Sequence, residues 1–144
     1  MLEARILGCG SSGGVPRLGG KDGTGFWGAC DPANPKNRRR RCSLLARRKS
    51  EAGETRVLID TSPDLREQLL DAGTKRLDAI LLTHSHADHT HGIDDIRPLV
   101  IHMHRRLDIH MDEATSAVMF RNPMAIVIHP LSLGVTTTRS SEPL

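Results

Sequence analysis

The feature that most constrains this chain is an apolar run that ends in a cluster of histidine and aspartate. The segment from Ile80 to Asp94 reads I-L-L-T-H-S-H-A-D-H-T-H-G-I-D. Its apolar part is typical of a buried strand, and the polar cluster follows where such a strand ends. In α/β proteins, ligands bind at the carboxyl ends of the strands. The segment therefore predicts a site at that edge of a sheet.

Four side chains of this segment are donors that suit a metal ion: His84, His86, Asp88 and His89. Imidazole and carboxylate groups fit Zn²⁺, Mn²⁺ or Fe. Because His84 and His86 are two positions apart, they lie on one side of an extended segment and can reach one ion. Asp88 and His89 follow where the chain must turn, so they can point to a neighbouring ion. The spacing favours a two-metal site over a histidine-rich polar loop.

Length and composition indicate one domain with a modest aliphatic core. The 144 residues include two Phe, one Trp and no Tyr, so Leu, Ile, Val and Ala must fill the core. There is no apolar run of membrane-spanning length and no signal peptide, since Met1 leads directly into a strand-like segment. Three cysteines, an odd number, argue against a disulfide framework. We therefore expect a cytoplasmic protein with no membrane partner.

Positive charge is concentrated in one loop. The net charge is +3, and four consecutive arginines, Arg38 to Arg41, follow Lys36. Polyanions or phosphate-bearing substrates suit such a run. No aromatic platforms accompany it, so a solvated loop is favoured and nucleic acid stays the weaker alternative. The stretch from Gly8 to Pro16 also has two interpretations, a phosphate cradle or, as we favour, a tight loop packed beside the site.

Periodicity predicts alternating strands and helices, and hence an α/β (α+β) fold. We expect strands at residues 2–8, 42–49, 55–59, 77–83 and 107–111, with a hairpin joining the second and third. Helices are expected from Pro63 to Gly73 behind a Ser62 cap, from Asp88 to about Val100, and over residues 112–120. Residues 19–41 show no periodicity and are expected to form an irregular loop.

Three stretches together resemble the metallo-β-lactamase fold superfamily of metallo-hydrolases. H-S-H-A-D-H at residues 84–89 is similar to its H-x-H-x-D-H signature. G-C-G-S-S-G-G-V-P-R at residues 8–17 and V-L-I-D-T-S at residues 57–62 look most like its PhnP-like phosphodiesterase branch. The glycine and proline signature is also similar to that of tRNase Z-like nucleases. The resemblance implies an αββα sandwich, with two sheets face to face and helices outside.

The resemblance covers residues 2–120 and implies that only the N-terminal half of the sandwich is present. The family's dinuclear site also needs a further histidine, a bridging aspartate and a final histidine. No aspartate follows Asp112, and the remaining histidines lack a strand-end context: His102, His104, His110 and His129. We therefore expect a truncated chain.

Two regions follow from this expectation. Residues 1–121 would form the N-terminal half of the domain. Residues 122–144 would form an atypical tail, irregular or disordered, because they hold only two charged side chains, Arg139 and Glu142, and no periodicity. One sheet without its partner would expose an apolar face, so we expect marginal stability, aggregation or association with another chain, as in a homodimer.

The resemblance also implies the chemistry of the complete site. Two divalent ions, zinc or manganese, would hold a hydroxide that attacks the phosphorus of a small phosphodiester substrate. His84 and His86 would bind one ion, and Asp88 and His89 the other, with Asp88 as the catalytic carboxylate. Asp60, at the end of its own strand, would either orient a metal ligand or serve as a turn residue hydrogen-bonded to backbone.

Other side chains near these stretches are expected to play no part in the site. His91 and Asp94 read as bystanders on the helix after the motif. A PhnP-type structural zinc needs closely spaced cysteines, whereas Cys30 and Cys42 are twelve positions apart and Cys9 sits in the glycine loop. This spacing disfavours a structural zinc.

Three functions remain in view. The first is a metal-dependent, phosphodiesterase-like hydrolase present as a partial copy. The second is a non-catalytic remnant that binds metal weakly or not at all, and metal stoichiometry separates it from the first. The third is a tRNase Z-like nuclease or nucleic-acid-binding module, which rests on the arginines and would show a salt-dependent affinity for RNA.

Overall fold

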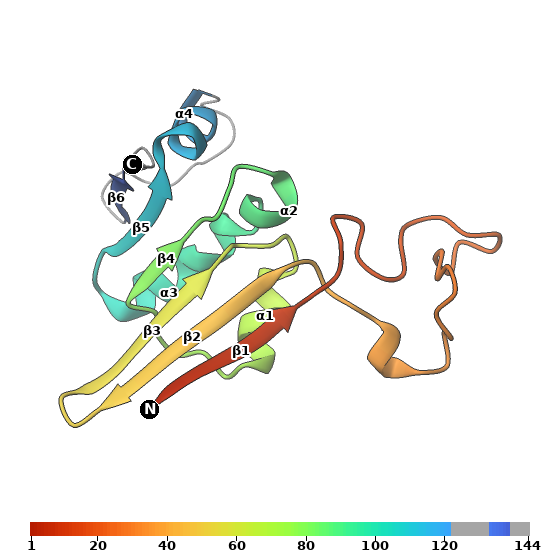
Figure 1. The fold of residues 1–144 in the computed structure, drawn as a ribbon, viewed down its shortest axis with the longest axis horizontal. Coiled ribbons are helices and arrows are strands. Elements are labelled where there is room, and N and C mark those ends of the chain that lie inside the picture. The colour runs from red at the N-terminus through yellow and green to blue at the C-terminus, as the bar shows by residue number, and fades with distance from the viewer. Residues whose placement is uncertain (122–132, 139–144) are drawn as a thin grey trace, which may run out of the picture.

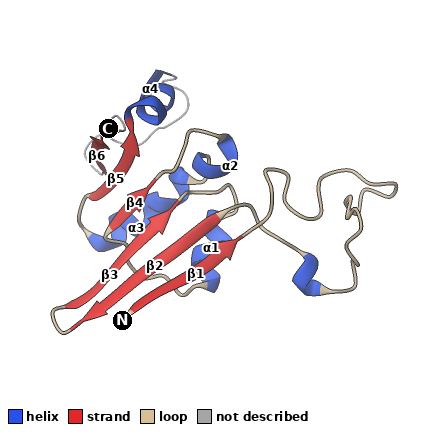
Figure 2. Ribbon diagram, viewed as in Figure 1, coloured by secondary structure: helices blue, strands red, loops and turns tan. Residues whose placement is uncertain are grey.

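The computed structural model describes residues 1–121 and the strand at residues 133–138. A long loop follows the first strand, and strands and helices alternate along the chain after the hairpin of the next two strands (Figures 1 and 2). The elements are β1 (Leu2–Gly8), η1 (Pro35–Asn37), β2 (Ser43–Ser50), β3 (Gly53–Ile59), α1 (Leu65–Asp71), β4 (Ala79–Leu81), α2 (Ala87–Thr90), η2 (Ile93–Ile96), α3 (Arg97–Met103), β5 (Leu107–Asp112), α4 (Glu113–Arg121) and β6 (Leu133–Thr138). This mixed arrangement confirms the predicted fold class.

One six-stranded sheet runs in the order β1-β2-β3-β4-β5-β6. The first three strands are antiparallel, and the pairs from β3 to β6 are parallel. The predicted hairpin is confirmed, with Ser50 opposite Gly53 at its turn. Because β3 and β4 are parallel neighbours that end at Ile59 and Leu81, the residues after both strands emerge at the same edge.

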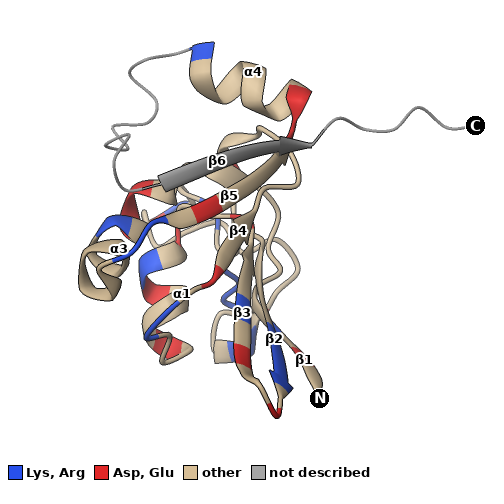
Figure 3. Cartoon of the chain, turned by 90° about the vertical axis from the view of Figure 1, so that its left-hand side faces the viewer, with Lys and Arg blue, Asp and Glu red and all other residues tan. Residues whose placement is uncertain are grey.

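The core lies between the sheet and the helices α1 and α3, which share one side of it (Figure 3). Leu58, Ile80 and Ile109 on the strands are at most 1% exposed and pack with Leu65 and Val100 of those helices. Aliphatic side chains make up the core, as the composition predicts. The contacts explain why helices with only seven residues are stable here, since short helices depend on packing.

The opposite face of the sheet is also apolar. Ile6, Leu44, Ile59 and Leu81 are paired in register, so they form one row across four strands. In this row Ile6 is 67% exposed and Leu81 is 40% exposed. The described residues thus form one sheet with a helix layer on one face, as expected for half of a sandwich.

The helix expected from Asp88 to Val100 is instead three short elements, α2, η2 and α3. Gly92 lies between α2 and η2 and donates its N–H to Thr61 O at 2.9 Å. A Cβ at this position would lie 1.8 Å from Ser62 O, so the backbone passes too close for any other residue. This contact between distant segments breaks a helix that the apolar spacing predicts as continuous.

Two other boundaries differ from expectation. α1 begins at Leu65 rather than at Pro63, although Ser62 still caps a turn, because its Oγ accepts the N–H of Asp64 at 3.2 Å. Within the predicted tail, Leu133–Thr138 forms β6 and pairs with β5, so this part is not irregular. Residues 122–132 and 139–144 lie outside the described residues.

The loop between β1 and β2 extends away from the sheet (Figure 1). It is irregular, as predicted, apart from η1 and three isolated bridges that pair Gly10 with Arg41, Val15 with Arg39 and Arg17 with Phe26. Among residues 1–121 and 133–138, no helix combines the length and apolarity needed to cross a bilayer.

Candidate metal centre

The histidines that follow β4 come together with those of α2. The ring centroids of His84 and His86 are 4.6 Å apart, and those of His84 and His89 are 4.0 Å apart. His84 and His89 are partly buried, whereas His86 is exposed. The Nε2 of His89 lies 3.5 Å from Oδ2 of Asp88. The four predicted donors therefore form one cluster at the edge of the sheet.

Asp60 lies under this cluster, immediately after β3. It is 4% exposed and has a left-handed backbone with φ 60°. Its Oδ1 accepts the N–H of Thr83 at 2.8 Å, and its Oδ2 accepts Nδ1–H of His89 at 2.7 Å. The contact with the Thr83 backbone is the one expected of a turn residue, and the contact with His89 fixes the orientation of that ring. That His89 binds a metal stays a prediction.

Thr83 extends the influence of Asp60 to a second histidine. The Thr83 hydroxyl lies 2.9 and 2.8 Å from the two Asp60 oxygens and 2.9 Å from Nδ1 of His84. The hydroxyl has one proton, and the carboxylate is the stronger acceptor, so its remaining interaction accepts Nδ1–H of His84. Both His84 and His89 then carry hydrogen on Nδ1, which leaves each Nε2 lone pair for a metal.

Backbone contacts attach α2 to the end of β3. Thr61 makes two of these contacts: its N–H donates to His89 O at 2.7 Å, and its hydroxyl donates to Thr90 O at 3.1 Å. The hydroxyl of Thr90 donates to His86 O at 3.0 Å. The motif is thus hydrogen-bonded to the end of the neighbouring strand.

The donor chemistry fits Zn²⁺ or Mn²⁺, but the donors do not close a site on their own. Within the part of the chain that the structure describes, no three His, Cys, Asp or Glu side chains are arranged to hold a single ion. In metal sites, a histidine that binds the ion usually donates its other ring N–H to a hydrogen-bond acceptor. His84 and His89 have such partners on Nδ1, so the cluster can supply part of a coordination shell.

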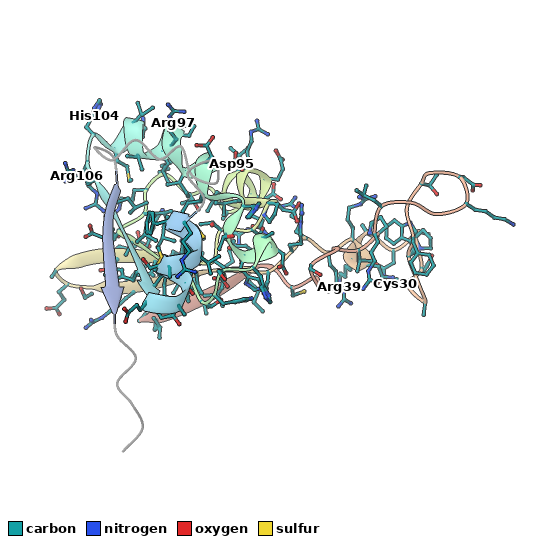
Figure 4. The ribbon with its side chains drawn as sticks, turned by 90° about the horizontal axis from the view of Figure 1, so that it is seen from above. Cys30, Arg39, Asp95, Arg97, His104 and Arg106 are labelled. Atoms are coloured by element: carbon teal, nitrogen blue, oxygen red, sulfur yellow. The ribbon has the colours of Figure 1, made fainter. Side chains whose placement is uncertain are left out.

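The remaining histidines near the motif stand apart from it. His91 is exposed, and its Nδ1 contacts the Thr90 hydroxyl at 3.1 Å. His110 lies on β5 opposite Leu81, and His104 ends α3 on another side of the molecule (Figure 4). Asp94 is exposed on η2.

The three cysteines are free thiols. Cys42, just before β2, is exposed overall, yet partial burial of its thiol raises its pKa, and the charges of Asp60, Cys9 and Asp88 add to the increase. Cys42 therefore lies within electrostatic reach of Asp60 and Asp88, while Cys30 belongs to the extended loop (Figure 4). No structural zinc group is formed by cysteines among the described residues.

Sequence reasoning missed Thr83, Thr61 and Ser43. Ser43 donates its hydroxyl to Asp60 O at 2.8 Å and so supports the aspartate from β2. Thr83 directly precedes the histidine motif. A hydroxyl side chain at the end of an apolar strand was the one sequence feature that could have pointed to it. The others act through contacts between segments far apart in the sequence.

Solved structures with similar folds are larger than this chain. A crystal structure of a diphosphatase from the PhnP family matches with a TM-score of 0.76 and 35% identity, over 96% of this chain and 52% of that one. Zn²⁺-bound PqqB from Methylobacterium extorquens matches with a TM-score of 0.69 and 20% identity, over 96% of this chain and 46% of that one. The chain thus spans about half the length of these structures.

Curated relatives match over shorter shares of their length. An octanoyltransferase of Porphyromonas gingivalis is 43% identical over 112 residues, which are 78% of this chain but 21% of that protein. Ribonuclease Z of a Bradyrhizobium species is 51% identical over 45 residues, 30% of this chain and 15% of that enzyme. Neither match covers enough of the relative to assign the activity of that protein to this chain.

A family model for the beta-lactamase superfamily domain matches residues 55–142, which include Asp60 and the whole histidine motif. This match covers more than half of the chain, and the PhnP-family structure agrees with it in fold. The resemblance predicted from the three sequence stretches is therefore confirmed. The chain belongs to the β-lactamase superfamily and has the metallo-β-lactamase fold.

Proposed function

We propose that this chain carries the metal-binding part of a hydrolase that cleaves phosphoric esters or anhydrides. The observation that supports this most is the paired orientation of His84 and His89. Both rings have Nδ1 hydrogen-bonded, directly or through Thr83, to the same buried carboxylate of Asp60. Such partners fix the tautomer of metal-ligating histidines.

In this proposal His84 and His86 bind one divalent ion, and Asp88 and His89 bind a second. When bound, two such ions supply an activated water and neutralise charge on the phosphoryl oxygens. The residues of the chain position them, since Asp60 keeps Nε2 of His89 available and Thr83 does the same for His84. Asp88, beside His89, brings the negative charge that a pair of cations needs.

A similar solved structure supports a substrate class. That protein is a diphosphatase at 35% identity, and the glycine-rich stretch of this chain also resembles PhnP-like phosphodiesterases. A small phosphate ester or anhydride is therefore the proposed substrate. A nuclease is the second candidate, because 45 residues of this chain are 51% identical to ribonuclease Z of a Bradyrhizobium species.

Metal content and phosphodiester hydrolysis test the proposal together. The purified chain is loaded with Zn²⁺ or Mn²⁺, and bound metal and turnover of bis(p-nitrophenyl) phosphate are measured. About two ions per site and metal-dependent turnover are expected. Turnover should be lost in His86→Ala and in Asp88→Ala.

His104→Asn is the matched control for the histidine variant. His104 has φ 51° at the end of α3, a conformation that asparagine tolerates, and it lies away from the motif (Figure 4). Fewer than two ions without turnover would favour the non-catalytic remnant. Cleavage of a pre-tRNA without hydrolysis of the small ester would favour the nuclease.

A further inference from the structure

Cys9 and Cys42 lie at the two ends of the long loop, where it leaves the sheet and where it returns. Gly8 and Ser43 are the last paired residues of β1 and β2 at this end, and they are antiparallel partners. Cys9 directly follows Gly8. Cys42 directly precedes Ser43, so each cysteine lies one residue beyond this pair. Both cysteines are exposed, and their thiols are free in this structure.

The backbones around the two cysteines are in close contact. A Cβ on Gly8 would overlap Arg41 O. A Cβ on Gly10 would lie 2.8 Å from Arg40 O, and the N–H of Gly10 donates to that oxygen at 2.7 Å. The backbones can approach this closely only because both residues are glycine. The first cysteine lies between these glycines and the second directly follows these arginines, so the fold holds the two cysteines next to each other.

The spacing of paired strands suits a disulfide. Residues that face each other across antiparallel strands have Cα atoms about 4.5–5.5 Å apart. A disulfide needs Cα atoms about 4.4–6.8 Å apart. The thiols are also within electrostatic reach of each other, because burial raises the pKa of Cys42 and the charges of Asp60 and Cys9 add to the increase. The geometry therefore places the two thiols where a bond between them can form.

Cys30 is placed differently. It belongs to the extended loop, where its N–H donates to Trp27 O at 3.0 Å, so a turn of the loop itself positions it (Figure 4). The three cysteines of the chain are thus one pair and one separate residue. A single exposed pair differs from the disulfide framework of small secreted domains, which the odd number of cysteines argues against.

We propose that Cys9 and Cys42 form a reversible intramolecular disulfide when the chain reacts with a low-molecular-weight disulfide such as oxidised glutathione. One thiolate attacks oxidised glutathione and releases one molecule of reduced glutathione. The other thiolate attacks the resulting mixed disulfide and releases a second. The two cysteines lose two electrons and two protons, and the two glutathione products carry them. Exposed disulfides are easily reduced, so an excess of reduced glutathione should reverse the reaction.

The bond would close the base of the loop beside the histidine motif. Ser43, next to Cys42, donates its hydroxyl to Asp60 O at 2.8 Å. Asp60 in turn orients His89. The pair is therefore one residue away from a group that supports the motif. The inference goes beyond the proposed hydrolase function and does not depend on it, because the disulfide forms whether or not the chain binds metal.

Mass spectrometry tests the inference on the full chain, treated with a chelator and then with oxidised glutathione. We expect the chain to lose the mass of two hydrogen atoms, and its free thiols to fall from three to one. Trypsin cleaves after Lys and Arg, so residues 6–17 should be recovered joined to residues 42–47. An excess of reduced glutathione should restore all three thiols.

Cys30→Ser is the matched control and should lose the same mass as the unmodified chain. Cys9→Ser and Cys42→Ser should show no such loss, because each keeps only one thiol of the pair. Circular dichroism checks that each variant is folded. The peptide map of the unmodified chain needs no substitution, so it decides the inference even where a variant unfolds.

Three results overturn the inference. The first is a glutathione adduct on Cys9 or Cys42 without a bond between them. The second is a disulfide that includes Cys30 or that links two chains. The third is a bond between Cys9 and Cys42 that an excess of reduced glutathione does not break, because such a bond is not reversible.

Discussion

Asp60 combines a left-handed backbone with a buried carboxylate. A non-glycine residue at φ 60° costs on the order of 1–3 kcal/mol when surrounding contacts must hold it there. Here the contacts are hydrogen bonds from the Thr83 backbone, the Thr83 hydroxyl and His89. Aspartate tolerates this conformation better than most residues. The strain therefore supports a position from which one carboxylate orients two imidazoles.

Replacing this carboxylate should weaken metal binding without unfolding the chain. Asparagine adopts the same backbone conformation, so Asp60→Asn keeps the turn. It lacks the charge that orients Nδ1–H of His89, and loss of such a partner typically costs about 10–100-fold in metal affinity. Competition with a chromophoric chelator measures the affinity. Asp94→Asn, an exposed aspartate on η2, should bind metal like the unmodified chain; equal losses in both variants would contradict the role of Asp60.

At the scale of elements, the sequence predicted the strands and helices whose formation depends on residues close in sequence. Strands β1, β2, β3 and β5 have the expected bounds within two residues. Asp112, directly before α4, accepts the N–H of Thr115 at 2.7 Å and so caps this helix. The break at Gly92 depends on the approach of Ser62, thirty residues away. β6 depends on pairing with β5. Neither contact leaves a signal in the local sequence.

The site divides in the same way. The clustering of the side chains of the histidine motif was predictable because these residues are close in sequence and follow the end of a strand. The supporting groups were not, because Ser43, Thr61 and Thr83 matter only through the strand order that brings β2, β3 and β4 side by side. The arginine run was apparent from the sequence as a run of positive charge, but its backbone hydrogen bonds with Gly10 and Val15 depend on how the loop folds.

The Arg41–Asp64 pair joins the arginine run to the start of α1, and its contribution to stability should depend on pH. Asp64 accepts from the Arg41 side chain and backbone, and the side-chain hydrogen bonds hold its pKa below the ordinary carboxyl value. A carboxyl with a lowered pKa in the folded state stabilises the fold above its unfolded pKa. This contribution is lost as the pH falls through the lowered pKa.

Asp64→Asn should therefore lower the free energy of unfolding by about 1 kcal/mol at pH 7, a value kept small by partial solvent exposure of the pair. The difference from the unmodified chain should shrink as the pH falls below about 4. Urea unfolding at several pH values measures both free energies. A difference that stays constant down to pH 3 would show that the charge of Asp64 is not the cause.

At the scale of the whole molecule, the described residues form a sheet with one face covered by helices and the other face open. Ile6, Leu44, Ile59 and Leu81 form a continuous apolar row on the exposed face, in a chain about half as long as the solved structures that share its fold. Apolar patches of this kind mark surfaces that bind other protein surfaces. Association with a second copy, the predicted homodimer, is one way to cover the row in the purified chain.

Ile6 and Ile101 allow that association to be tested. They are exposed to similar extents, 67% and 64%, but Ile6 is on the open face of β1 and Ile101 is on α3. Burial of an isoleucine contributes about 1.5–3 kcal/mol, so Ile6→Lys should weaken self-association roughly 10- to 100-fold. Ile101→Lys should leave it unchanged. Sedimentation velocity over a range of protein concentrations measures both, and an equal effect of the two substitutions would mean that the sheet face is not the contact surface.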